Sequence, residues 1–409
     1  MNFFTGLYLL LFFFGIFFIT IFLILHWRHR KDLFYSPEAK TFPSVSFLVP
    51  AYNEEKSLKE TVEALMEIDY PKNKKEILII NDGSTDGTLK IAKDLEKKYS
   101  IVKVINKKNS GKANSLNHAI RFAKGELIAV VDADSYPKKD SLKKMVGYFE
   151  DEKVAAVTSR VLVKNKKKWI ERYQVLDYSI IAWTRKLLDF VDSVYVTNGP
   201  LSVYRKREVI KVGGFDPTNL TEDIEITWHL LSEGYKTRMA YNAIVYTTVP
   251  DNFSQWTKQR VRWNLGGMQT IRKYRKAMFH NPENAFGYFV VPYVSASFAF
   301  AIIGIFLVLR YIWIKGAYNL ASFYYAFFGY DYLKYIGFDM YVTLLLLMAG
   351  LFFTLSIIYY KTGFKNSETG KKSVLKILIY SVTYRSLYTI PLVIALYKLA
   401  RGDTRWYTK

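Results

Sequence analysis

The chain is 409 residues long, carries a formal net charge of +22, and is 50% hydrophobic and 17% aromatic. That length exceeds one typical domain, and the composition indicates a partly soluble, partly membrane-embedded protein. Much of the Lys and Arg borders the apolar runs, where positive flanks and anionic lipid explain the charge. We therefore expect no nucleic-acid partner. The sequence has no cysteine, no GxGxxG fingerprint and no Walker A loop, which excludes disulfides, thiolate zinc sites and phosphate binding by a glycine-rich loop.

Residues 3–25 are almost wholly apolar and carry no charge, and about 20 such residues span a bilayer. A cleaved signal peptide fits less well, because no basic region precedes the run. Basic residues follow at 26–31, and positive flanks stay in the cytoplasm. We therefore predict an N-terminal transmembrane helix within residues 1–31 of a multi-pass cell-membrane protein, with the chain after residue 31 in the cytoplasm.

From about residue 42, predicted strands and helices alternate. Strands are predicted at 45–49, 76–81, 101–105, 127–131 and 154–159, and helices at 55–68, 112–123 and 169–190. Such alternation implies a parallel sheet with helices on both faces. The sequence therefore predicts an α/β domain with a Rossmann-like, mostly parallel sheet.

Two aspartates, Asp132 and Asp134, follow the apolar run 127–131 directly. Ligands of open parallel sheets bind beyond the carboxyl ends of the strands. Being two apart on an extended segment, the two side chains are expected to point the same way. Paired carboxylates suit Mg²⁺ or Mn²⁺, which completes its shell with substrate phosphates, although a strand followed by a polar turn gives the same pattern.

The C-terminal part contains three further apolar runs. Runs 286–309 and 341–360 are predicted to span the membrane, and the aromatic segment 314–340 between them suits the outer interface. Run 377–397 has Arg385 near its middle, which is costly on a lipid-facing helix. We expect this run to lie in the interface or to re-enter, with the tail in the cytoplasm; the alternative is a tilted fourth span with Arg385 buried against other helices.

Three more stretches carry polar motifs: Val49–Glu55 at the end of the first strand, Asn219–Asp223 before a helical segment, and Gln259–Trp263. Alone, each has an ordinary interpretation as a turn, an N-cap or an amphipathic surface helix. On a helix, residues 259 and 262 share a face, with residue 263 one position along. Their order and spacing together are poorly explained by chance.

In these motifs the chain resembles the processive, membrane-embedded family-2 glycosyltransferases, which include cellulose, chitin, hyaluronan and poly-N-acetylglucosamine synthases. The matching residues are Asp82, Asp132, Asp134, Thr221, Glu222, Asp223, Gln259, Arg262 and Trp263. The Gln-x-x-Arg-Trp motif is the most specific, because family-2 enzymes that add one sugar generally lack it. Residues 111–117 also resemble the family's lysine-bearing loop, and 198–201 the loop beside the acceptor.

The resemblance implies a GT-A fold for the cytoplasmic α/β domain and an α-helical membrane region. The expected divisions are an N-terminal transmembrane helix at 1–31, a GT-A domain at 40–253, an interface helix at 254–280 and C-terminal transmembrane and interfacial helices at 281–409.

The resemblance also implies roles at the donor site. Tyr52 and Glu54 would meet a uracil base, and Asp82 the base or ribose. Asp132 and Asp134 would hold Mg²⁺ or Mn²⁺ against the leaving diphosphate. The remaining donor-site residues would be Lys112, Gln259 and Arg262, two of which supply positive charge to phosphate oxygens.

At the acceptor, Asp223 would act as the general base on the attacking hydroxyl group. One displacement inverts the anomeric centre, so an α-linked donor gives a β-linked product. Trp263 would offer a flat face to the acceptor sugar, with Asn198 and Glu222 nearby.

The leading hypothesis is a processive enzyme that polymerises a sugar from a nucleotide donor and moves the polysaccharide across the lipid bilayer. UDP-N-acetylglucosamine is the preferred donor, because the membrane layout looks closest to poly-N-acetylglucosamine and hyaluronan synthases; UDP-glucose remains open. The alternatives are a single-addition transferase acting on a lipid-phosphate carrier, and a non-catalytic sugar-binding membrane scaffold.

Overall fold

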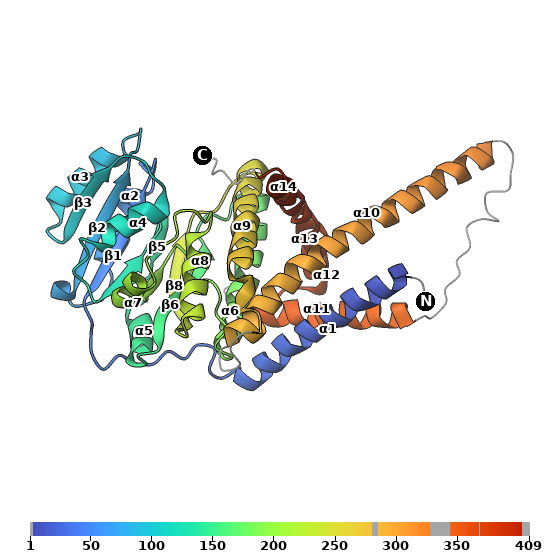
Figure 1. The fold of residues 1–409 in the computed structure, drawn as a ribbon, viewed down its shortest axis with the longest axis horizontal. Coiled ribbons are helices and arrows are strands. Elements are labelled where there is room, and N and C mark those ends of the chain that lie inside the picture. Colours follow the sequence, from blue (N-terminus) through green and yellow to red (C-terminus); the bar gives the residue numbers. More distant parts are fainter. Residues whose placement is uncertain (1–2, 280–284, 328–343, 368, 403–409) are drawn as a thin grey trace.

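The structure is a computed structural model that describes residues 3–279, 285–327, 344–367 and 369–402, without the side chains of 317–327 and 385. It consists of a mixed α/β body and a set of long helices. Helices α1 (Phe3–His29), α10 (Val291–Phe327) and α11 (Leu344–Lys365) project from the same side of the α/β body (Figure 1). The predicted combination of an α/β domain and long apolar helices is confirmed.

One eight-stranded sheet organises the α/β body, in the order β3-β2-β1-β4-β7-β6-β8-β5. The strands are β1 Val45–Ala51, β2 Lys75–Asp82, β3 Val102–Lys107, β4 Leu127–Val130, β5 Ser135–Pro137, β6 Val154–Val163, β7 Ser202–Arg205 and β8 Lys236–Thr247. Parallel pairing joins β3, β2, β1 and β4, and also β6 with β8. Strand β7 is antiparallel to β4 and β6, and β5 to β8, so the sheet is mixed but mostly parallel, as predicted.

Helices cover both faces of the sheet. They are α2 Leu58–Met66, α3 Thr88–Lys98, α4 Lys112–Ile120, α5 Lys143–Val146, α6 Trp169–Asp189, α7 Lys206–Lys211 and α8 Glu222–Ser232. Helix α9 (Phe253–Tyr274) packs on α8 and α10. Successive strand side chains point to opposite faces. In β1, Phe47 packs with Leu58 of α2 in one core, whereas Leu48 packs with Leu116 of α4 in the other. This explains why apolar residues follow one another at 47–49 of β1.

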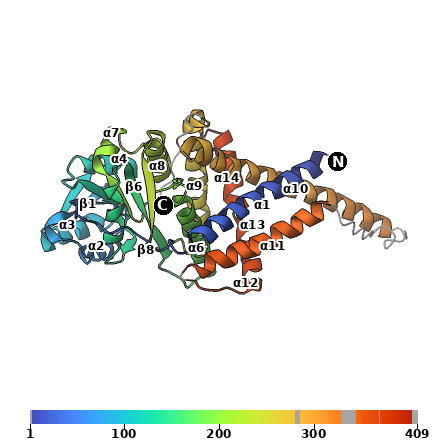
Figure 2. The same cartoon turned by 90° about the horizontal axis from the view of Figure 1, so that it is seen from below.

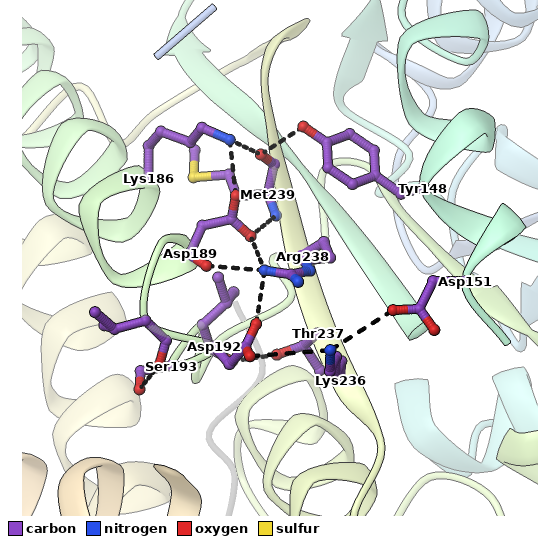
Figure 3. A network of polar contacts seen from close by, with 12 residues as sticks. Tyr148, Asp151, Lys186, Asp189, Asp192, Ser193, Lys236, Thr237, Arg238 and Met239 are labelled. Atoms are coloured by element: carbon purple, nitrogen blue, oxygen red, sulfur yellow. Dashed lines mark hydrogen bonds and ion pairs between the residues drawn. The ribbon is translucent and has the colours of Figure 1, made fainter. Parts of the chain in front are cut away.

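Helix α6 is anchored to β8 by a polar network that Figure 3 shows. Lys186 donates to the carboxylate of Asp189 at 2.7 Å and to the backbone carbonyl of Met239 at 3.1 Å, and both side chains of the ion pair are at most 5% exposed. The other Asp189 oxygen accepts from the Met239 backbone N–H at 3.0 Å, and Arg238 pairs with Asp192 at 2.7 Å. Helix α6 is therefore held firmly at its C-terminal end.

Four helical segments are long and apolar enough to cross a membrane: Phe3–His29, Phe286–Gly316, Leu344–Lys365 and Val374–Ala400. The first three contain most of the predicted spans, and helix α10 continues into the segment predicted for the outer interface, whose residues 328–340 lie outside the described part. These candidates indicate a multi-pass membrane protein.

The last candidate is a broken helix, made of α12 (Val374–Ile379), a π-helical turn (Tyr380–Tyr384), α13 (Arg385–Leu387) and α14 (Thr389–Ala400). In Figures 1 and 2 it runs across the direction of α1 and α11, and α14 lies alongside α9. Whether it spans the membrane or lies in the interface stays a prediction, because the side chain of Arg385 lies outside the described part.

Candidate active site

A lysine bridges two carboxylates at the carboxyl end of β4. The ammonium of Lys112 lies 2.6 Å from Oδ1 of Asp132 and 2.6 Å from Oε1 of Glu222. Lys112 begins α4, Glu222 begins α8, and Asp132 follows β4. The fold thus brings together three motifs that are distant in the sequence, at the sheet edge where ligands bind.

Asp82 organises the loop that leads to this lysine. Its Oδ1 accepts from Lys107 and from the Ser110 backbone N–H at 3.0 Å, and its Oδ2 accepts from the Gly111 N–H at 2.9 Å. Gly111 has a φ of +89°, which favours glycine, and it directly precedes α4. Asp82 therefore fixes the start of α4; its expected contact with a base or ribose stays a prediction.

The expectation that Asp132 and Asp134 lie on an extended segment is wrong. Strand β4 ends at Val130, and the Ser135 backbone N–H donates to the Asp132 carbonyl at 3.0 Å, which closes a turn over these residues. Asp134 Oδ1 accepts from Ser135 Oγ at 3.3 Å and from Thr247 Oγ1 of β8 at 3.4 Å. The antiparallel pairing of β5 with β8 produces this turn, because it redirects the chain just after β4.

Gly199 closes one side of the Lys112–Asp132 pair. A Cβ atom at this position would lie 2.6 Å from Asp132 Oδ2 and 2.8 Å from Lys112 Nζ. The Gly199 carbonyl also accepts from the Asp132 backbone N–H at 3.2 Å. Only a residue without a side chain fits here without displacing the pair.

Burial and the local charges shift the pKa values of the cluster. Burial lowers the pKa of Lys112, but Asp132 and the two acids of α8 outweigh it and raise that pKa above its ordinary value. Burial raises the pKa of Glu222, yet Lys112 and Arg262 bring it below its ordinary value. Burial and the neighbouring Glu222 raise the pKa of Asp223 to about 6. Of the two adjacent acids on α8, Glu222 is therefore the permanent anion and Asp223 the group that can exchange a proton near neutral pH.

The acidic residues fit a cation that takes much of its coordination from the substrate. Within the described residues, no group of three or more His, Cys, Asp or Glu side chains is arranged to hold a metal ion. Asp132 and Asp134 both lie partly exposed on the turn after β4. Two partly exposed carboxylates suit Mg²⁺ or Mn²⁺, which bind through one or two carboxylates and substrate phosphates.

Helix α9 carries Gln259, Arg262 and Trp263, as the sequence predicts, and it docks against the segment before α8. Leu220 donates its backbone N–H to the Gln269 side chain at 3.0 Å, and Arg262 lies 3.5 Å from the Leu220 carbonyl. These contacts hold the two motifs in a fixed relation.

A glycine allows the closest approach between these elements. A Cβ at Gly266 of α9 would lie 2.6 Å from Cγ2 of Thr221, the N-cap residue of α8. The side chain of Asn219 also donates to Thr270 Oγ1 at 2.9 Å. The Thr-Glu-Asp motif and the Gln-x-x-Arg-Trp motif are therefore parts of one packed unit.

Trp263 lies on α9 beside a buried arginine. The guanidinium carbon of Arg260 lies 4.0 Å from the centroid of the Trp263 ring, and the Tyr178 ring centroid lies 6.5 Å from it. Trp263 remains partly exposed, and Gln259 Oε1 is buried without a hydrogen-bond partner among the described residues. The Arg260 guanidinium therefore contacts one face of the Trp263 ring, which is the predicted platform for the acceptor sugar.

The segment Tyr52–Glu54 follows β1, where the sequence places it. The Glu54 backbone N–H donates to Thr88 Oγ1 at 2.8 Å, and Ser57 Oγ donates to the Glu54 carboxylate at 2.7 Å. Tyr52 is partly buried in the same loop. The loop is thus fixed against the start of α3, and its contact with a base stays a prediction.

Asn198 is committed to contacts within the domain. Its backbone N–H donates to Thr158 Oγ1 at 3.1 Å, its amide nitrogen donates to the Ser159 carbonyl at 3.2 Å, and its amide oxygen accepts from Arg185. Its side chain is buried, so Asn198 shapes the wall behind Gly199, and its predicted contact with an acceptor stays a prediction.

Sequence reasoning missed Lys107, Arg185 and Arg260. Lys107 ends β3, beside the carboxyl end of β2, and strand order could have pointed to it. Arg260 lies between two motif positions and four residues after Trp256, on the same face of the helix. A charged residue on an apolar helical face could have pointed to it. Arg185 lies on α6 with no local pattern that marks it.

Comparisons with known proteins agree with this geometry. Residues 43–266 match the family profile described as glycosyltransferase-like family 2. The chain is 31% identical over 244 residues to the poly-β-1,6-N-acetyl-D-glucosamine synthase of Staphylococcus epidermidis, which covers 59% of each chain. It is also 31% identical over 229 residues to the enzyme of the same name from Staphylococcus aureus, covering 56% of this chain and 55% of that one. The match thus spans less than two thirds of the length of these relatives.

A solved mannosyltransferase from Pyrobaculum calidifontis, in complex with GDP-Man and Mn²⁺, has a similar fold. The likeness has a TM-score of 0.59 at 20% identity and covers 98% of this chain and 99% of that one. The likeness concerns the fold alone. The predicted GT-A-like architecture with accompanying apolar helices is confirmed.

Proposed function

Because the chain belongs to glycosyltransferase-like family 2, we infer that it transfers a sugar from a nucleotide-sugar donor to an acceptor hydroxyl group with inversion at the anomeric carbon. One observation carries this inference. Two adjacent acids at the start of α8 are differentiated by Lys112, which keeps Glu222 charged, whereas burial and Glu222 raise the pKa of Asp223 to about 6. An acid with that pKa can act as a general base near neutral pH.

The donor diphosphate is proposed to lie at the carboxyl end of β4. Lys112 and Arg262 supply fixed positive charge there, and Asp132 and Asp134 would hold Mg²⁺ or Mn²⁺. The bound cation supplies charge neutralisation of the leaving diphosphate. Tyr52, Glu54 and Asp82 are proposed to contact the base and ribose, and Gln259 the donor.

In the reaction, the acceptor oxygen attacks the anomeric carbon and its proton passes to the Asp223 carboxylate. The bond between the anomeric carbon and the phosphate oxygen breaks, and the nucleoside diphosphate leaves with the electron pair. A positioned base contributes roughly 100- to 10,000-fold to the rate of such a step. Trp263 is proposed to stack on the acceptor sugar, with Asn198 and Glu222 nearby.

We further propose that the enzyme adds sugars repeatedly to a β-linked polysaccharide and moves the chain across the membrane, with UDP-N-acetylglucosamine as donor. The 31% identity to two poly-β-1,6-N-acetyl-D-glucosamine synthases and the four candidate membrane helices support this proposal. The proposal includes the divisions 1–31, 40–253, 254–280 and 281–409, with the catalytic domain in the cytoplasm.

The test offers radiolabelled UDP-N-acetylglucosamine, UDP-glucose and GDP-mannose to membranes containing the full chain, with Mg²⁺ or Mn²⁺, and sizes the products on a gel. Polymer from UDP-N-acetylglucosamine is expected, and membranes containing the Asp223→Asn variant serve as the control. If the only product were one discrete glycolipid, the enzyme would instead add a single sugar to a lipid carrier. If none of the three donors gave transfer or hydrolysis, the catalytic proposal would be overturned.

A further inference from the structure

A buried ion pair joins α6 to α9 beside Trp263. Arg260 Nη2 lies 3.0 Å from Asp177 Oδ2, and the two side chains are 0% and 6% exposed. Burial lowers the pKa of Arg260, but Tyr384 and Asp177 outweigh it and raise that pKa above its ordinary value, so the arginine is charged. Replacing a buried ion pair with apolar residues is often neutral or stabilising, so helix packing alone does not account for this pair.

The C-terminal segment completes the same network. Tyr384, in the π-helical turn after α12, donates its hydroxyl to Asp177 Oδ2 at 3.3 Å and accepts from Trp256 Nε1 at 2.9 Å. Tyr380 donates to Asp177 Oδ1 at 3.4 Å. Both tyrosines are at most 1% exposed. Asp177 therefore links the catalytic domain to a segment more than 200 residues later in the chain.

The network ends on the indole of Trp263. The guanidinium carbon of Arg260 lies 4.0 Å from the ring centroid, which is well within the distance of a cation–π contact. Nε and Nη1 of Arg260 have no hydrogen-bond partner among the described residues. The orientation of the guanidinium is therefore set by Asp177, Tyr384 and the surrounding rings.

We propose that Asp177, Arg260 and Tyr384 are positioning residues that fix the indole of Trp263 as the acceptor platform, so that the C-terminal segment 374–400 controls acceptor engagement. This inference rests on the proposed function, in which Trp263 stacks on the acceptor sugar. Shifting α12–α14 removes the Tyr384 hydroxyl from Asp177, loosens the Arg260 guanidinium and releases the indole. Donor binding at Lys112 and Asp132 is not touched by these contacts.

The test uses the full chain and measures the ratio of sugar transferred to donor hydrolysed. Tyr384→Phe removes one hydroxyl, and Arg260→Lys retains the charge but loses the planar fork that pairs with Asp177 and stacks on Trp263. Both are expected to lower the ratio by about fivefold or more, the scale of a perturbed cation–π contact. Hydrolysis without acceptor is expected to stay near the wild-type rate.

Asp189→Asn is the matched control. It breaks the Lys186–Asp189 ion pair, which is equally buried and lies on the same helix as Asp177 but belongs to the network that anchors α6 to β8 (Figure 3). It is expected to lower the melting temperature without changing the ratio. A change of the ratio in Asp189→Asn equal to that in Tyr384→Phe would overturn the proposal, because general loosening of α6 would then explain both.

A double-mutant cycle separates this inference from the proposed function. If the network acts through the indole, Arg260→Lys has no further effect on the ratio in a Trp263→Ala background. An undiminished effect in that background, or unchanged ratios in folded Tyr384→Phe and Arg260→Lys variants, would overturn the positioning role. A normal ratio in Trp263→Ala alone would instead overturn the proposed role of Trp263 as acceptor platform.

Discussion

At the scale of single residues, the two adjacent acids at the start of α8 have opposite tendencies. Glu222 pairs with Lys112, whereas Asp223 has a pKa of about 6 because of burial and the charge of Glu222. The base must be unprotonated to accept the proton of the acceptor hydroxyl. The profile of kcat/KM, which reports the free enzyme, should therefore fall as the pH drops below about 6.

The charge of Glu222 gives this prediction a direction. Glu222→Gln removes a negative neighbour, so the pKa of Asp223 should fall and the acidic limb should move to lower pH. A limb that stays in place in Glu222→Gln, or that is missing between pH 5 and 7 in the wild type, would assign the base to another group. Transfer rates measured across that range provide the comparison.

The proposed cation makes a separate prediction for Asp134. Asp134→Ala should weaken nucleotide binding when Mn²⁺ is present and change it little in EDTA, because the carboxylate acts through the cation. Binding is measured by calorimetry in both conditions. Equal weakening in both would indicate a role for Asp134 in the turn after β4, where it accepts from Ser135 and Thr247.

Some of these residues could be predicted and others could not. Lys112 was predicted from a motif, and the structure adds its two carboxylate partners. Arg260 was missed because it occupies a variable position of the Gln-x-x-Arg-Trp motif. Its ion-pair partner, Asp177, lies on a different helix, so the sequence around Arg260 gives no sign of the pair. Asp82 was also predicted from a motif, and the structure adds the hydrogen bonds that its oxygens accept from the loop before Lys112; its contact with the nucleotide stays a prediction.

At the scale of elements, the packing of α9 on α8 carries the site. A Cβ at Gly266 would lie 2.6 Å from Cγ2 and 2.8 Å from Cβ of Thr221, so the two helices would have to move apart or the short Thr221 side chain would have to shift. Gly266→Ala should therefore cost about 1–3 kcal/mol of stability, as overpacking does, and should lower transfer strongly. Thermal unfolding and transfer are measured together.

Gly267→Ala provides the control, since its Cβ would lie 3.3 Å from the ring of Phe298 on α10. It is expected to have the smaller effect on both measurements. If Gly266→Ala unfolded at the wild-type temperature and kept full transfer, the close contact between α9 and α8 would not be needed for the site.

The parallel half of the sheet was predictable because most of its strands contain consecutive apolar residues, such as 47–49, 77–80 and 127–131, between helices. Strands β5, β7 and β8 were not predicted, since β5 and β7 are very short and pair antiparallel with partners distant in the sequence. The turn at Asp132 depends on that pairing, which is why the expected extended segment was wrong.

At the scale of the whole molecule, the long helices expose apolar side chains that water would not favour. Phe13 of α1, Leu309 of α10 and Leu347 of α11 are each more than half exposed. Their spans were predictable from length and composition alone. The course of α12–α14 across them was not, because it depends on the packing of α14 against α9 through Ala395, Val261 and Leu265.

The arrangement of α12–α14 predicts where the end of the chain lies. If α12–α14 lies along the interface, Ala400 at the end of α14 faces the cytoplasm. An Ala400→Cys variant of this cysteine-free chain should then react with an impermeant maleimide only after the cells are permeabilised. Labelling of intact cells would instead show that α12–α14 crosses the bilayer.

Asp223 is proposed to remove the proton of an acceptor hydroxyl group during sugar transfer. The most direct measurement compares wild type and Asp223→Asn for transfer from the labelled nucleotide sugar and for nucleotide affinity. Loss of the base should reduce transfer by about 100-fold or more while affinity changes little, because Asp223 acts on the acceptor. Retention of more than about a tenth of the wild-type transfer rate would contradict the claim.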